Sequence, residues 1–94
     1  MKSFEEYDWD RMYIKTQDWI ERNGIPGRVK TGCRAVYAGL PLVDIEIPCR
    51  GNKSIIARVR NYRNVYEDRG YTANGRRYCV FRIEFTENEE IANG

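Results

Sequence analysis

Residues 12–29 read MYIKTQDWIERNGIPGRV, and the spacing of the apolar side chains changes within this stretch. Before Asn23-Gly24 the apolar residues recur every three or four positions, which is the period of an amphipathic helix. From Arg28 onward they alternate with polar residues, which is the period of a half-buried strand. Asn23-Gly24 is a typical helix C-cap, and Pro26 prevents the helix from continuing. The sequence therefore predicts one helix followed by antiparallel strands.

The predicted helix covers about residues 4–22. Ser3-Phe4-Glu5-Glu6 has the S-x-x-E spacing of a capping box and opens it, with Thr16 as an alternative second N-cap that would split it near Lys15. One face forms a stripe of the width expected for a side that packs on a core. This predicted stripe consists of Trp9, Met12, Tyr13, Thr16, Trp19 and Ile20.

Phe4, Tyr7 and Ile14 fall on the other side of the same predicted helix. Single exposed apolar residues are common on protein surfaces, so one reading is simple exposure or packing against a loop. The other reading is a small docking surface for a partner chain or for a second copy of this chain. These three residues are therefore a secondary candidate for partner binding.

Four further segments carry strand patterns. Residues 33–39 form the first predicted strand, and Val43, Ile45 and Ile47 are the inward side of the second. Residues 55–62 are predicted as the third strand, with Ile55, Ala57 and Val59 inward and with Ile56, Arg58, Arg60 and Tyr62 outward. A turn is expected within 66–70, and Asn74-Gly75 is the strongest hairpin signal of the chain. The last strand places Cys79, Phe81, Ile83 and Phe85 on one face and Tyr78, Val80, Arg82 and Glu84 on the other, and residues 86–94 are expected to fray.

The predicted fold class is α+β. One N-terminal helix, at about residues 4–22, covers one face of a four- to five-stranded antiparallel sheet whose other face is wet. A sheet curled into a small barrel is the alternative. The chain of 94 residues is long enough for one domain, at 1–94, with one modest core.

Composition excludes several classes of protein. The chain contains 41% apolar and 32% charged residues, as in ordinary folded domains. It has no apolar run near the length of about 20 residues that spans a bilayer. The N-terminus turns acidic at once and lacks the apolar segment of a signal peptide, so we expect a cytoplasmic protein. Histidine is absent, which removes the commonest general base and the most versatile metal ligand.

Charge is segregated along the chain. Residues 1–24 carry a net charge of −2, residues 25–82 carry +8, and residues 83–94 carry −4, for an overall charge of +2. Twelve of the 16 basic residues are arginine, which binds carboxylates and phosphates bidentately and stacks on aromatic rings. The acidic ends could fold onto the basic middle, or a basic surface could stay open for an anionic partner. The plainer interpretation is a compositional bias on a solvated sheet face.

The three cysteines, at positions 33, 49 and 79, are widely spaced and form no C-x-x-C pair. A zinc site would therefore lack its usual four ligands, and no metal is expected. Because reduced thiols are the rule in the cytosol, we expect all three to be free. A bridge between Cys33 and Cys49 across a hairpin is the alternative.

Other patterns that could carry chemistry are weak. Gly27–Gly32 resembles a phosphate-binding loop only in composition, since the glycine before the lysine is missing and a strand follows where a helix should. Asp44 and Glu46 share one strand face and could bind a divalent cation, but such residues more often pair with an arginine on the next strand. Cys49 has a cationic neighbour, Arg50, but no base. We therefore expect no catalytic residue, no cofactor and no enzyme activity.

The most informative pattern is arginine interleaved with tyrosine in the basic middle. Guanidinium groups bind carboxylates or phosphates, while tyrosine rings anchor protein interfaces or stack on bases. Packing between neighbouring strands that merely covers the sheet is the alternative. The predicted partner-binding residues are Arg58, Arg60, Tyr62, Arg63, Tyr66, Arg76, Arg77, Tyr78 and Arg82.

Two functions fit these observations. The first is a small protein-binding inhibitor or adaptor whose partner is an acidic protein surface or a nucleoprotein complex. In style, though by no shared motif, this is similar to phage-encoded inhibitors of host defence complexes such as anti-CRISPR proteins. The second is a nucleic-acid-binding module that uses the same face, against which stand the small net charge and a pI near 8.5. No membrane partner is expected, and a homodimer is an open alternative.

Overall fold

The first helix ends where the apolar period changes. In the computed structural model, which describes residues 2–92, α1 spans Trp9–Arg22 and Asn23 is its C-cap, followed by Gly24 with a positive φ of 63°. The predicted helix of 4–22 is, however, divided. A 3₁₀ turn, η1 (Phe4–Glu6), is separated from α1 by extended backbone at Tyr7, and the Asp8 carboxylate accepts from the Arg11 N–H to cap α1. The predicted capping box of Ser3 and Glu6 is present but opens η1, whereas Asp8 is the N-cap of α1 and Thr16 lies within that helix.

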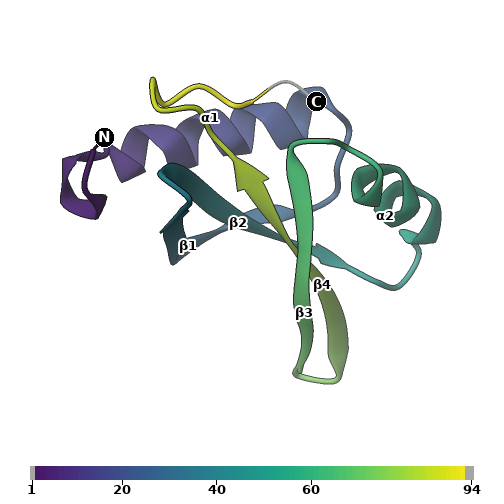
Figure 1. The fold of residues 1–94 in the computed structure, drawn as a ribbon. Helices are drawn as coiled ribbons and strands as arrows, with labels where there is room; N and C mark the ends of the chain where they lie inside the picture. Colours follow the sequence, from purple (N-terminus) through teal and green to yellow (C-terminus); the bar gives the residue numbers. More distant parts are fainter. Residues whose placement is uncertain (1, 93–94) are drawn as a thin grey trace.

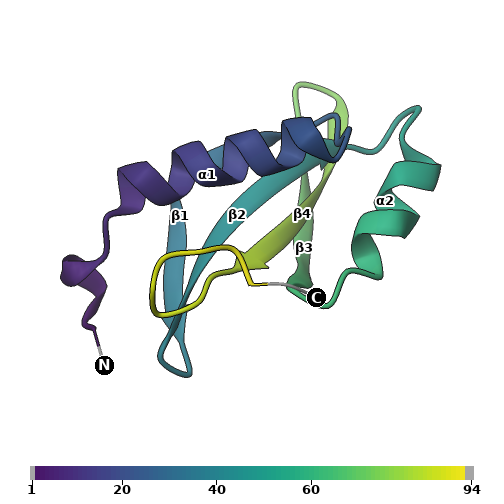
Figure 2. The ribbon, with the colours of Figure 1, turned by 90° about the horizontal axis from the view of Figure 1, so that it is seen from above.

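α1 lies across one face of the sheet (Figures 1 and 2). Of its predicted stripe, Trp9, Met12, Thr16 and Ile20 are buried, whereas Tyr13 and Trp19 are half-buried. The Thr16 hydroxyl donates to the Met12 carbonyl at 2.8 Å. This bond to the preceding turn satisfies the hydroxyl, so that a polar side chain can lie within the core. The stripe prediction is confirmed for the four buried residues.

The sheet has four antiparallel strands. They are β1 (Arg28–Tyr37), β2 (Leu40–Pro48), β3 (Val65–Ala73) and β4 (Arg76–Glu84), in the spatial order β1-β2-β4-β3. The predicted α+β class is confirmed, and the sheet is open because β1 and β3 each pair on one side only within the described residues. The core lies between α1 and the inward residues of β2 and β4, which include Val43, Ile45, Ile47, Phe81 and Ile83.

The predicted third strand is a helix. α2 spans Lys53–Arg60, at the β3 end of the sheet (Figure 1). Ile56 and Val59 are buried, and their i,i+3 spacing places both on one helix face. The prediction of a strand was therefore wrong, and so was the prediction that Ile56 faces solvent. Within residues 2–92, neither α2 nor α1 is long and apolar enough to cross a membrane.

The turn expected at 66–70 is also wrong, because these residues lie within β3. The register with β4 shifts between Asp68 and Tyr71, which marks a bulge. Gly70 lies within it, and a Cβ there would lie 2.5 Å from the Tyr78 carbonyl oxygen. Only glycine, which has no Cβ, allows the two backbones to approach this closely. The expected turn is thus an irregularity inside a strand.

The hairpin turn at Asn74-Gly75 is confirmed. Both residues have positive φ, at 51° and 75°. Positive φ at both central residues is what a type I′ turn requires. The hairpin of β3 and β4 extends well beyond the rest of the sheet, as the lower arm of Figure 1 shows. The tip of this hairpin therefore lies away from the part of the sheet that α1 covers.

The polar segment after β4 does not fray as far as residue 92. Phe85 forms a β-bridge with Ile91, and the Ala92 N–H donates to the Glu84 carbonyl. Ion pairs to Lys2 and Lys15 then hold Glu89 and Glu90 against the N-terminal part of the chain, at 2.9 and 2.8 Å. Positions 93 and 94 of the predicted tail lie outside the described residues.

Candidate functional site

The sheet face opposite α1 carries an unusual set of buried charges. We call it the open face, and it consists of the β2 carboxylates with their neighbours on the other strands: Arg28, Asp44, Glu46, Tyr66, Asp68, Tyr71, Tyr78, Arg82 and Glu84. The register brings these together, since Asp44 pairs with Arg82 and Tyr66 lies opposite Arg82 on the next strand. Asp44 and Glu46 are only 6% and 3% exposed although they lie on the side of the sheet away from α1.

Arg82 lies between two carboxylates. Its Nε is 3.3 Å from Asp44 Oδ1 and 3.2 Å from Asp68 Oδ2, without hydrogen-bond geometry to either. Burial raises the pKa of Asp44 from its ordinary value of 3.8 to about 6; the Arg82 guanidinium opposes this rise, and the charge of Asp68 adds to it. The guanidinium is therefore neutralised within the fold and is a poor anchor for an external anion.

Glu46 is held in the same way. Its carboxylate accepts from Arg28 Nε at 2.6 Å and from the Tyr71 hydroxyl. The Tyr71 ring stacks on Tyr78 with ring centroids 5.1 Å apart, and the Lys30 ammonium lies 4.3 Å from the Tyr71 centroid. Both tyrosines are thus part of a closed network and not an open stacking platform.

A cavity of about 420 Å³ lies at the other end of the open face, between the β1–β2 hairpin and β3. Its walls include Tyr37, Leu40, Leu42 and Tyr66, while Asp68, Arg82 and Glu84 supply its charge. The Tyr66 hydroxyl donates to Glu84 Oε2 at 2.9 Å, which fixes the ring on this wall. The cavity is apolar with more acidic than basic groups, so it does not suit a phosphate.

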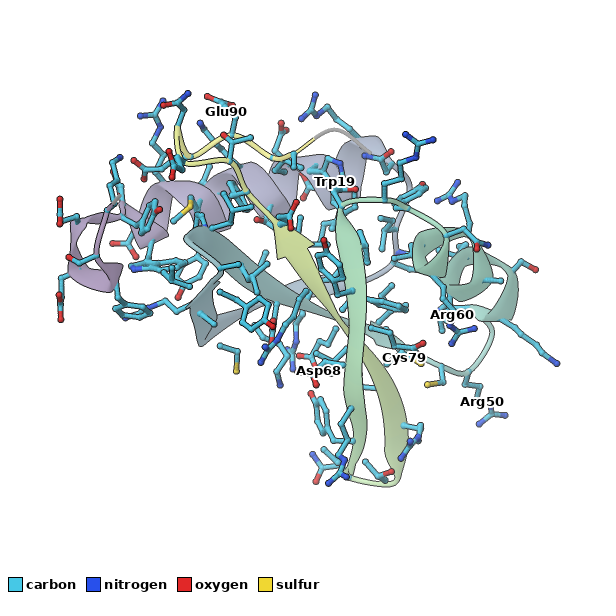
Figure 3. All side chains as sticks on the ribbon, viewed as in Figure 1. Trp19, Arg50, Arg60, Asp68, Cys79 and Glu90 are labelled. Atoms are coloured by element: carbon cyan, nitrogen blue, oxygen red, sulfur yellow. The ribbon has the colours of Figure 1, made fainter. Side chains whose placement is uncertain are left out.

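A second surface holds seven of the ten cations that form no ion pair with a carboxylate among residues 2–92; the other three are Arg11, Lys30 and Arg34. We call it the basic surface, and it comprises exposed residues of α2, its flanking turns and the β3–β4 hairpin: Arg50, Lys53, Arg58, Arg63, Arg69, Arg76 and Arg77. In the part of the chain that the structure describes, none of these seven forms an ion pair with a carboxylate. In Figure 3, Arg50 points away from the body beside α2, whereas Asp68 lies on the sheet.

The predicted partner-binding residues do not form one surface. Arg58 and Arg60 were expected on a sheet face but lie on α2, where Arg60 is already paired with Glu67 at 2.8 Å. Tyr62 follows α2 and packs edge-on against Trp19 with ring centroids 5.8 Å apart. Of the nine, Arg58, Arg63, Arg76 and Arg77 belong to the basic surface, while Tyr66, Tyr78 and Arg82 lie on the open face.

The secondary docking surface is also divided. Tyr7 is buried, and its hydroxyl donates to the Gly39 carbonyl at 3.3 Å, because the chain bends between η1 and α1 and turns this ring into the core. Phe4 is 39% exposed and packs beside Trp9, while Ile14 is 70% exposed on α1. The expectation that Tyr7 faces solvent was therefore wrong.

The β2 carboxylates and the cysteines were the candidate metal and thiol groups of the sequence. Across residues 2–92, no three Cys, Asp or Glu side chains converge as metal ligands. Asp44 and Glu46 pair with arginines on neighbouring strands, as the alternative to a cation site predicted, although both are buried and not solvated. All three cysteines are unbridged, as expected.

Sequence reasoning missed the network that Asp44, Glu46 and Tyr71 build. The one available signal was the alternation of Asp44 and Glu46 with Val43, Ile45 and Ile47 in an apolar strand. Comparison with protein-family models, curated proteins and solved structures finds no match to this chain. Function is therefore inferred from the side chains themselves.

Proposed function

We propose that this chain is a non-enzymatic binding protein, an inhibitor or adaptor, whose basic surface docks on an acidic surface of a partner protein. The observation that carries the proposal is the contrast in pairing. Seven exposed cations of α2, its flanking turns and the β3–β4 hairpin lack a carboxylate partner among residues 2–92, whereas Arg28 and Arg82 on the open face are paired. Unpaired like charges on one surface create a field that steers and orients an oppositely charged partner.

The cations of the basic surface have no role in the core that would explain them. Each of the seven is exposed, and the α2 core contacts come from Ile56 and Val59. Arg58 makes one contact to the rest of the fold, a hydrogen bond from its Nη2 to the Asn23 carbonyl at 2.6 Å. Exposed charges of this kind contribute little to stability, so a binding role accounts for their number better than a folding role does.

A protein partner is favoured over single-stranded nucleic acid by the state of the tyrosines. Base stacking needs exposed aromatic faces beside the cations. Tyr62 packs against Trp19, Tyr71 stacks on Tyr78, and Tyr66 is bonded to Glu84. The small net charge of +2 also falls short of a typical nucleic-acid-binding domain.

Duplex nucleic acid is the second candidate, because one observation favours it. The β3–β4 hairpin projects from the body, carries Arg69, Arg76 and Arg77, and contains no acidic residue between positions 69 and 83. A two-stranded ribbon of this kind fits the major groove of a duplex. Its arginines would contact phosphates in that case.

The test is a double charge reversal, Arg63→Glu with Arg76→Glu, compared with the control Arg11→Glu with Arg22→Glu on α1. Both variants change the net charge by the same amount, and both replace exposed residues. Affinity for a partner captured from cells that express the chain should fall at least tenfold in the first variant and less than about threefold in the control, because one reversed interface arginine typically costs about 2 kcal/mol. Equal affinities of the two variants would contradict the proposal.

Nuclease and salt separate the two candidates. A protein partner should survive nuclease treatment and lose affinity modestly between about 50 and 200 mM salt. Duplex binding through six or more phosphates should instead be abolished by nuclease and should weaken by roughly three orders of magnitude over the same range.

A further inference from the structure

Two of the three thiols meet beneath α2. The Cys49 Sγ lies 2.9 Å from the Cys79 Sγ. A covalent S–S bond is about 2.05 Å long, so only a small approach of the two sulfurs separates this contact from a bond. Cys49 directly follows β2, and its N–H donates to the Arg77 carbonyl at 2.9 Å, which extends the β2–β4 pairing by one step. Both side chains are partly buried and pack against the core, and Cys79 lies between the hairpin and α2 in Figure 3.

We propose that Cys49 and Cys79 form a disulfide with each other when the protein meets a low-molecular-weight disulfide such as oxidised glutathione. In the first step one of the two thiolates attacks a glutathione sulfur, the glutathione S–S bond breaks, and one glutathione thiolate leaves. In the second step the other cysteine attacks the mixed disulfide and releases the second glutathione. The protein loses two electrons and two protons, and the oxidised glutathione becomes two thiols.

The fold itself selects this pair over Cys33. Pairing between β2 and β4 holds both cysteines in place. The Cys49 N–H is hydrogen-bonded to β4, and Cys79 pairs with Ile47 of β2. Cys33 is exposed on β1, which neighbours β2 and does not pair with β4. The alternative bridge from the sequence, Cys33 to Cys49, does not fit the register, because Arg34 next to Cys33 pairs with Val43, six residues before Cys49.

The surroundings of Cys79 keep its thiol protonated at neutral pH. Burial and the contact with Cys49 raise the pKa of the Cys79 thiol to about 11; the charge of Glu67 adds to this rise and that of Arg60 opposes it. A protonated thiol is a poor nucleophile, so attack by Cys79 on oxidised glutathione should become faster as pH rises toward this pKa.

Closing the bond would tie α2 and β3 into a loop. Residues 49–79 contain both elements, and Arg50 and Arg77, each within two residues of a bridging cysteine, belong to the basic surface. Through the proposed function, the bond would thus fix the two halves of that surface relative to each other, although bond formation itself does not depend on that function.

The test uses the whole reduced protein treated with excess oxidised glutathione, then denatured and alkylated. We expect a mass two hydrogens lighter than the reduced chain, with one alkylated thiol. Trypsin without reductant should give peptide 35–50 joined to peptide 78–82, while the peptide 31–34 that holds Cys33 carries the alkyl group. The Tm of the oxidised protein should rise by about 5–15 °C, since the bond constrains the unfolded chain.

Matched variants keep the result interpretable. Cys33→Ser should form the same linked peptides, whereas Cys79→Ser should gain only mixed disulfides with glutathione. Glutathione on all three cysteines of the wild type, a bond to Cys33, or a lower Tm on oxidation would each overturn the proposal. Because the wild type alone yields these readouts, a variant that fails to fold leaves the conclusion unchanged.

Discussion

The open face and the basic surface both carry arginines, yet these arginines differ in what surrounds them. On the open face the strand register sets Asp44 opposite Arg82, so the charges are paired and partly buried. On the basic surface the arginines lie on a short helix and a projecting hairpin, where no carboxylate of residues 2–92 pairs with them. Neighbours across strands, and not the density of arginine and tyrosine along the chain, decide which groups stabilise the fold and which are available to bind.

The largest effect that would sharpen this comparison is the pH dependence of Asp44. Because its folded pKa of about 6 lies above its ordinary 3.8, the folded chain holds the extra proton between these values, and stability rises as pH falls. Relative to Asp44→Asn, the wild type should gain roughly 2–3 kcal/mol between pH 7 and pH 4. Denaturant titrations of both proteins across this pH range measure the difference in their unfolding free energies. A difference that stays constant with pH would show that burial does not raise the pKa of Asp44.

Surface pairs should respond to pH in the opposite direction. The hydrogen bond from Arg60 lowers the pKa of Glu67, so the stability that this pair contributes is present at neutral pH and is lost as pH falls through that lowered value. Glu67→Gln should therefore lower the unfolding free energy at neutral pH, and this loss should become smaller as pH falls. The same denaturant titrations, run on this variant, give the Asp44 measurement an internal control of opposite sign.

The next effect compares two arginines of the same strand. Arg82→Met should cost about 2 kcal/mol, because it leaves Asp44 buried beside Asp68 with no cation between them. Arg76→Met, on the basic surface, should change stability by less than about 0.5 kcal/mol. In thermal melts the first variant should lose about 10 °C and the second almost nothing. Equal losses would break the distinction between the two surfaces.

A smaller effect separates two tyrosines within the open face. Tyr71→Phe removes the hydroxyl that donates to the buried Glu46. It should cost about 1 kcal/mol. Tyr66→Phe removes a hydrogen bond to Glu84 from a residue that is 49% exposed. Tyr66→Phe should cost less than about 0.5 kcal/mol, because water can take the place of the Tyr66 hydroxyl as a hydrogen-bond donor to Glu84. Urea midpoints of the two variants give the ranking, and equal midpoints would show that water reaches Glu46.

The smallest effect compares the turns of the two hairpins. Asn74-Gly75 on the basic surface has the residues that a type I′ turn prefers. The β1–β2 turn instead places Ala38 at a φ of 52° before Gly39. Ala38→Asn should therefore stabilise the protein by about 0.5 kcal/mol, and Asn74→Ala should destabilise it by a similar amount. Opposite shifts in Tm are expected, and shifts of the same sign would show that contacts, not backbone preference, decide these turns.

The sequence predicts well where one side of an element is apolar. The α1 stripe, the alternation of Val43, Ile45 and Ile47, and the Asn74-Gly75 turn were all recognisable from local pattern. Residues 53–60 were not, since eight residues fit either period and their β-branched side chains favoured a strand. β3 was missed because an edge strand that runs through Glu67 to Gly70 has no apolar alternation to detect.

The candidate site was predictable in composition but not in arrangement. The arginines of the basic middle could be identified from the sequence. Because the predicted third strand is in fact α2, however, Arg58 and Arg60 do not lie on the sheet face. The pairing of Asp44 with Arg82 depends on the β2–β4 register, and that of Glu46 with Tyr71 depends on three strands at once. Such long-range placement is not encoded in the spacing of neighbouring residues.

The irregular edges of the sheet carry one more consequence. Pairing along β1 is interrupted between Val29 and Arg34, and pairing along β3 is interrupted between Asp68 and Tyr71, so neither edge offers more than four regular residues in a row. Interrupted, charged edges are poor templates for an added strand, which is the route by which sheet proteins polymerise or capture extended peptides. Concentrated solutions of this protein should therefore stay dispersed, and we expect a partner to bind its side chains rather than its strand edges.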